Sequence, residues 1–172
     1  MLRALATVAS AALAVVGLAL AAPQKDTYNL TANLRVRFEV PKPTGVRPGA
    51  VGLFTGKAVE LESDRVRVTW RLTFSKLTGR AVAAHVHAGR AGKAGNVLVP
   101  LCGPCRSGQR GTANLSHAQL RAIRRGATYV NVHTVRNAAG EVRGQLKASE
   151  ASSTPPDDPS PSPEPPPTTP YP

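Results

Sequence analysis

The sequence predicts an all-β fold, an antiparallel β-sandwich or barrel of about seven or eight strands with one short helix. Apolar and polar residues alternate with a period of two in several stretches, and clusters of turn residues separate these stretches. Only one segment has the caps and the spacing of a helix. About 125 residues lie between two atypical chain ends, which is enough for one domain with a hydrophobic core.

The first half of the domain contains the clearest strands. Residues 28–40 and 65–74 alternate throughout, which predicts half-buried strands of an antiparallel sheet. Between them, residues 41–48 contain three prolines and a glycine and predict a turn, and residues 50–61 predict another strand. Trp70, the only tryptophan, falls on the inward side of its strand and is expected to anchor the core.

The second half combines further strands with the helix. Strands are expected at residues 81–88, 96–101, 128–135 and 141–147, and the last two form a hairpin. The helix begins after Ser116, which forms a capping box with Gln119, and it ends at Gly126. Leu120 and Ile123 are predicted to face the core from this helix.

Three of the four histidines lie in predicted strands. Because strand side chains alternate between faces, His85 and His87 project to the same side, about 7 Å apart, within bridging reach of one metal ion. His133, from a neighbouring strand, could complete a set of three ligands. Imidazole suits copper or zinc, and three ligands leave an open coordination position. The alternative is a structural role, in which these histidines form hydrogen bonds with the backbone, with one another or with nearby polar side chains.

The same segments resemble a known family. The motifs are Ala-His-x-His-x-Gly at residues 84–89, a short helix ending in glycine, Tyr-Val-Asn-Val-His-Thr at 129–134, and Gly-Glu-Val-Arg-Gly-Gln-Leu at 140–146. In this order they resemble the CHRD domain, which is named after chordin and is common in secreted bacterial proteins. The resemblance covers residues 27–148 and implies a single-domain secreted protein that acts as a binding or structural module.

The two chain ends differ from the domain in composition. Residues 1–21 have a positive start, an apolar stretch and a small-x-small cleavage site, which predict a secretory signal peptide rather than the alternative, a transmembrane helix. No later apolar run is long enough to span a bilayer, so a secreted or envelope-associated protein is expected. Residues 150–172 are rich in Pro, Ser and Thr and predict a disordered tail, either a spacer or a ligand for a proline-binding module.

Cys102 and Cys105 have the Cys-x-x-Cys spacing of a thioredoxin-type redox centre. Such a centre needs its first cysteine at the start of a helix, whose dipole lowers the pKa of the thiol. Residues 106–111 instead have the composition of a loop. In an oxidising compartment the two cysteines are therefore expected to form a structural disulfide, with redox activity and a zinc site as alternatives.

Positive charge is concentrated in the domain. Residues 24–149 contain 21 Lys and Arg against 6 Asp and Glu, whereas residues 150–172 contain four acidic residues and no basic one. Five arginines lie on the outward faces of the two clearest strands: Arg35, Arg37, Arg65, Arg67 and Arg71. If these strands are neighbours, the arginines form a patch for an anionic envelope polymer or protein; the alternative is a solvated face. Few aromatic residues lie among the charges, so no nucleic-acid partner is expected.

These features favour a secreted CHRD-type binding or structural module of unknown extracellular ligand, without catalysis. No pair of nucleophile and general base is recognisable in the sequence. The alternative function is an extracellular copper- or zinc-binding protein that uses the three-histidine site. The two functions are distinguished by whether the three imidazoles converge in space.

Overall fold

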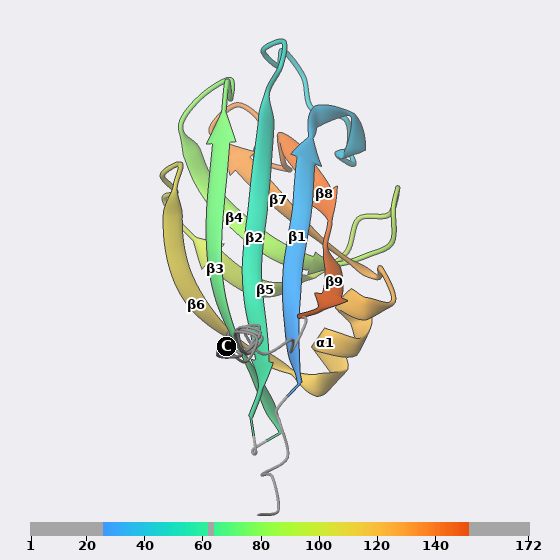
Figure 1. The fold of residues 1–172 in the computed structure, drawn as a ribbon. Helices are drawn as coiled ribbons and strands as arrows, with labels where there is room; N and C mark the ends of the chain where they lie inside the picture. The colour runs from blue at the N-terminus through green and yellow to red at the C-terminus, as the bar shows by residue number, and fades with distance from the viewer. Residues whose placement is uncertain (1–25, 62–63, 152–172) are drawn as a thin grey trace, which may run out of the picture.

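The fold is described by a computed structural model that covers residues 26–61 and 64–151 (Figure 1). Within these residues the strands are β1 Thr27–Arg35, β2 Val51–Glu60, β3 Arg65–Ser75, β4 Ala81–Ala88, β5 Val97–Cys102, β6 Gln109–Ser116, β7 Thr128–Thr134, β8 Val142–Gln145 and β9 Lys147–Glu150. One α-helix, α1 His117–Arg124, and one 3-10 turn, η1 Val36–Phe38, accompany them. The predicted all-β fold with a single short helix is confirmed.

The strands form one strongly curved antiparallel sheet in the order β5-β4-β7-β8-β1-β2-β3-β6, and β9 pairs with β1 beyond β8. In Figure 1 the strands β6, β3, β2 and β1 lie in front, and β4, β5 and β7 cross behind them. The two parts meet where β8 pairs with β1, at Arg143 opposite Arg35. The sheet is therefore a nearly closed barrel, and the core fills the space between its two walls.

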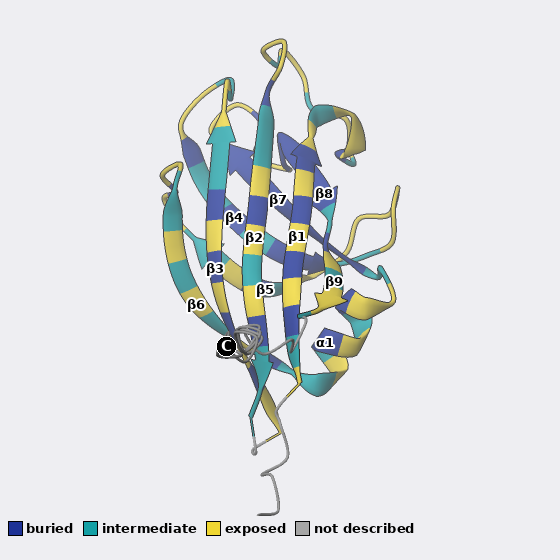
Figure 2. Cartoon of the chain, in the orientation of Figure 1, coloured by how far each residue is buried: buried dark blue, intermediate teal, exposed yellow. Residues whose placement is uncertain are grey.

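The core follows the predicted alternation. Every second residue of β1 is buried from Tyr28 to Leu34, and the same holds in β3 from Val66 to Leu72. This pattern is visible as alternating dark blue and yellow bands along these strands in Figure 2. Trp70 is 6% exposed, and its ring lies 6.4 Å from that of Phe54, which confirms its predicted place in the core.

Helix α1 closes one end of the barrel and has the predicted caps. Ser116 Oγ accepts a hydrogen bond from the Gln119 amide, and Gln119 Oε1 accepts one from the Ser116 amide. Leu120 and Ile123 are each 2% exposed and pack on the core. Gly126 follows with a φ of +66°, a conformation that favours glycine after a helix.

Three strand predictions were inaccurate. The strand predicted for residues 28–40 ends at Arg35, because Arg35 is opposite Val51, where β2 begins, and no partner continues the ladder. The chain then turns through η1, so that Phe38 is 44% exposed and Glu39 is buried, the reverse of the predicted alternation. The loop expected after the cysteines contains the start of β6, and the strand expected at residues 141–147 is divided into β8 and β9.

The predicted signal peptide lies outside the described residues. The predicted tail does so as well, except for its first residues, since β9 ends at Glu150 and the described part ends at Ala151. Within the described residues, no helix has the length and apolarity needed to cross a bilayer.

Candidate metal centre

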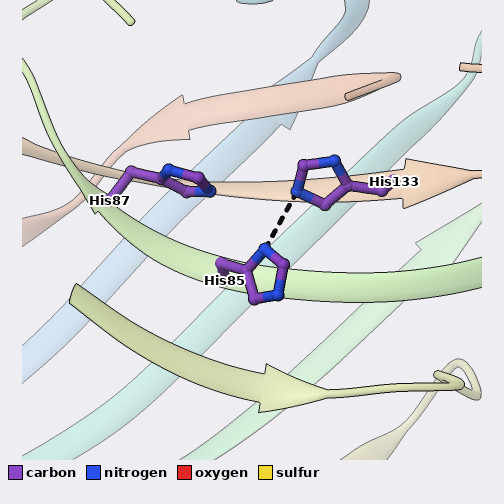
Figure 3. A group of neighbouring side chains, drawn as sticks. All are labelled: His85, His87 and His133. Atoms are coloured by element: carbon purple, nitrogen blue, oxygen red, sulfur yellow. Dashed lines mark hydrogen bonds between the residues drawn. The ribbon is translucent and has the colours of Figure 1, made fainter. Parts of the chain in front are cut away.

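Strands β4 and β7 bring His85, His87 and His133 together, as Figure 3 shows. In the antiparallel pairing, His85 is opposite Asn131, His87 is opposite Tyr129, and His133 is opposite Ala83. Residues opposite each other share a face, so all three imidazoles lie on the outer face of the barrel wall. The convergence that the spacing of the histidines predicted is present.

The three rings surround a common point. Their centroids are 4.9 Å apart for His85 and His133, 5.4 Å for His85 and His87, and 5.9 Å for His87 and His133. One nitrogen from each ring lies within 4.8 Å of the nitrogens of the other two. Three nitrogens bound to one ion at about 2.0–2.1 Å are about 3.3–3.6 Å apart, so the rings would have to close by about 1 Å to share an ion.

Backbone carbonyls determine which nitrogens face this point. The Nδ1 of His87 is 2.9 Å from the Gly95 carbonyl oxygen, and the Nδ1 of His133 is 2.9 Å from that of Ala138. A carbonyl only accepts hydrogen bonds, so both Nδ1 atoms carry the proton in the neutral rings and both Nε2 atoms carry a lone pair. Metal-binding histidines are commonly oriented by a hydrogen bond of this kind from their second nitrogen.

The two lone pairs have different surroundings. The Nε2 of His133 lies 3.1 Å from the Nδ1 of His85, which therefore donates a hydrogen bond to it. The Nε2 of His87 is buried and has no hydrogen-bond partner among the described residues. A buried acceptor without a partner costs about 1–3 kcal/mol, and a metal ion at the common point would remove this cost.

The site favours uncharged imidazoles. Burial, together with repulsion from His133 and His87, lowers the pKa of His85 to about 4. Burial also lowers the pKa of His133, although the bond to Ala138 opposes this shift. At neutral pH both rings are therefore neutral and able to bind a cation, because a metal ligand must first lose its proton.

A stacked cluster supports His87. The Tyr129 ring is parallel to the His87 ring within 5°, with centroids 4.9 Å apart, and the Arg143 guanidinium carbon lies 3.4 Å from the Tyr129 centroid. Arg143 in turn donates to the carbonyl oxygens of Arg90 and Lys93 at 3.0 and 2.8 Å. These two residues belong to the loop of residues 89–96, which also provides the Gly95 carbonyl. The loop and the sheet thus fix His87 together.

A buried carboxylate lies near Asn131, the residue of β7 opposite His85. Glu39 is 2% exposed, and burial raises its pKa to about 7, against the lowering effects of the Val40 amide and of Arg143. The other buried acid, Glu141, has its pKa lowered by hydrogen bonds from Thr134, Thr78 and Asn137, which outweigh the effect of burial. Glu141 therefore stabilises the β7–β8 turn. The sequence pattern did not indicate Tyr129, Gly95 or Glu39 as part of the site.

The fourth histidine lies elsewhere. His117 is in the first turn of α1, with its Nδ1 3.3 Å from a Glu60 carboxylate oxygen and its Nε2 3.9 Å from one of Asp64. It is partly exposed and lies outside the cluster of three histidines.

The cysteines form the predicted disulfide. Cys102, the last residue of β5, is bonded to Cys105 in the connection to β6, with their Cα atoms 5.2 Å apart. The following residues enter a strand rather than a helix, so the arrangement that activates a thioredoxin-type cysteine is absent at this motif. With both sulfur atoms in the disulfide, neither is a thiolate ligand for zinc.

The arginines do not form the single patch that neighbouring strands would give, because β2 lies between β1 and β3. Arg65, Arg67 and Arg71 are exposed on the outer face of β3. Arg35 lies at the end of β1, and Arg37 is in η1 rather than in a strand. The five arginines therefore do not lie on neighbouring strands.

Comparison with known proteins identifies the family. The family model of the CHRD domain matches residues 30–146, more than half of the chain, and this range includes the three converging histidines and the disulfide. No curated protein and no solved structure matches the sequence significantly. The match extends from β1 to the end of β8, and it confirms the resemblance inferred from the motifs. The chain belongs to the CHRD-domain family.

Proposed function

We propose that this CHRD-domain protein is an extracellular binding module in which His85, His87 and His133 hold one copper or zinc ion. The observation that carries the proposal is the buried Nε2 of His87, which lies beside two other imidazoles and has no hydrogen-bond partner in residues 26–61 and 64–151. A purely structural histidine cluster would be expected to satisfy this atom. The donor set supports copper or zinc, because imidazole suits both ions.

Each residue would have a definite role. His87 and His133 are oriented before the ion arrives, since their Nδ1 protons are held by Gly95 and Ala138. His85 is less restrained, because its Nδ1 bonds only to the Nε2 of His133. To bind the ion through Nδ1, His85 would carry its proton on Nε2 instead, and its ring would turn from His133 towards the ion. Three protein ligands leave a coordination position for water or a further ligand. His85 is the most exposed of the three, so that position would be reached from its side.

An extracellular location fits two observations. Disulfides persist in oxidising compartments, and the Cys102–Cys105 bond is present. CHRD domains occur in secreted proteins, and the predicted signal peptide at residues 1–21 would direct export. The absence of a recognisable nucleophile and base pair in the sequence supports binding rather than catalysis.

Calorimetric titration of untagged protein with zinc and with cupric ions tests the proposal. Wild type and His117→Ala, which removes the histidine outside the cluster, should each bind one ion per chain. His87→Ala should lose this binding, and so should His85→Ala, which alters a partly exposed side chain and leaves the core intact. Circular dichroism confirms folding. The proposal would be overturned if wild type bound neither ion, or if His85→Ala and His87→Ala bound the ion with wild-type affinity.

A further inference from the structure

A hollow lies on the outer surface of the barrel. It has a volume of about 690 Å³ and lies between the outer face of β1, η1, the loop of residues 89–96 and the start of β9. Its lining includes Arg35, Arg37, Phe38, Val40 and Lys147, and no histidine. This volume falls within the range of about 300–1,000 Å³ that is usual for small-molecule sites.

The charge of this hollow has one sign. Arg35, Arg37 and Lys147 are exposed cations, and no acidic residue lines it. Among residues 26–61 and 64–151, none of the three cations lies in an ion pair. The nearest acid along the chain, Glu39, is buried on the other side of η1, where its Oε2 lies next to Gly140. The cations therefore remain available to a ligand.

An apolar surface adjoins the cations. Phe38 is 44% exposed although it is a large aromatic residue, and Val40 beside it is half-buried. The Arg37 guanidinium carbon lies 4.7 Å from the Phe38 ring centroid, a cation–π contact that orients the guanidinium. Stacking of this kind leaves the N–H groups at the edge of the guanidinium, which suit the two oxygens of a carboxylate, phosphate or sulfonate.

We propose that this hollow binds a small organic oxyanion with an apolar body. The anionic group lies among Arg35, Arg37 and Lys147, and the apolar part packs on Phe38 and Val40. The alternative, a long polyanion, would engage basic side chains over the whole surface and would not need Phe38. None of the three histidines lines this site, although the loop of residues 89–96 borders both the hollow and His87.

Binding of naphthalene-2-sulfonate and naphthalene-2-carboxylate, followed by probe fluorescence or by NMR, tests the proposal, with 2-naphthylmethanol as the neutral analogue. The double variant Arg35→Gln/Arg37→Gln should lower the affinity for both anions about tenfold or more. Arg65→Gln/Arg67→Gln removes the same charge from exposed positions outside the hollow and should keep wild-type affinity. Phe38→Ser should weaken both naphthalene probes and leave the weak binding of inorganic sulfate unchanged.

Three results would overturn the proposal. The first is no binding of either anion to wild type. The second is equal binding of the neutral analogue, which would show that charge plays no part. The third is an equal loss in the two double variants, together with tighter binding of long-chain polyphosphate than of the naphthalene probes, which would indicate a diffuse polyanion surface instead.

Discussion

The Gly95 carbonyl orients the proposed metal ligand His87 through a hydrogen bond and is not itself a proposed ligand. The substitution Gly95→Ala therefore tests the site without changing a histidine. A Cβ at residue 95 would meet the Ala88 carbonyl of β4, its oxygen most closely and its carbon at 2.9 Å. Carbon atoms in contact normally lie about 3.5–4.0 Å apart. The backbone cannot simply rotate away, because the Ala88 amide donates to the Asn96 carbonyl at 2.9 Å. The loop must therefore shift by about 1 Å.

Such a shift removes the restraint on His87. The bond from His87 Nδ1 to the Gly95 carbonyl is 2.9 Å long, and about 1 Å more takes it beyond hydrogen-bonding distance. Loss of an outer partner of a metal ligand typically lowers metal affinity about 10- to 100-fold. We expect a change of this size, together with a loss of about 1–3 kcal/mol in the free energy of unfolding of the metal-free protein.

Competition with a chromophoric chelator measures the affinity, and nitrogen-15 NMR of the imidazoles reports the tautomer of His87. Gly79→Ala is the matched control, because its Cβ would have no atom within 4 Å and its φ lies outside the range that favours glycine. An unchanged affinity in Gly95→Ala, with the Nδ1 proton of His87 still in place, would refute the role assigned to this carbonyl.

Three further predictions concern the fold and its pH dependence. Ser116→Ala removes the cap of α1 and should lower the free energy of unfolding by about 0.5–2 kcal/mol in urea denaturation, whereas Ser149→Ala should have little effect. Gly144→Ala would place a Cβ against the backbone of Asn33 in β1, 2.7 Å from its carbonyl carbon, and should lower the melting temperature far more than Gly79→Ala; equal melting temperatures would contradict the close packing of β8 on β1. Glu39 has its pKa raised from 4.5 to about 7, so its contribution to stability is complete below pH 4.5 and is lost as the pH rises through 7. Glu39→Gln should remove that loss of stability between pH 5 and 8. The titration of His85 acts in the opposite direction but is common to both proteins. Parallel plots of the free energy of unfolding against pH would therefore exclude this role for Glu39.

The parts of the site that depend on local pattern could be predicted from the sequence. A period of two places His85 and His87 on one face whatever the surrounding fold, and the capping box at Ser116 depends on residues within one turn. The motif order also indicated the family. Trp70 was predicted in the core because its whole strand alternates cleanly.

The remaining parts depend on contacts between distant segments. The Gly95 and Ala138 carbonyls are backbone groups, so no residue type marks them as partners of His87 and His133. The order of the strands placed β2 between the two arginine-bearing strands, and alternation within a strand carries no information about its neighbours. Strand β6 is an edge strand with few apolar residues, and Gly111 within it accommodates the Trp70 ring, so its composition resembled a loop.

The most direct test of the metal centre is the anomalous diffraction of crystals soaked in zinc, recorded above and below the zinc edge. We predict one strong peak among the three imidazoles, about 2.0–2.1 Å from the Nε2 atoms of His87 and His133 and from a nitrogen of His85. A peak beside His117 and Glu60, where a surface imidazole and a carboxylate are 3.3 Å apart, with none among His85, His87 and His133, would contradict it.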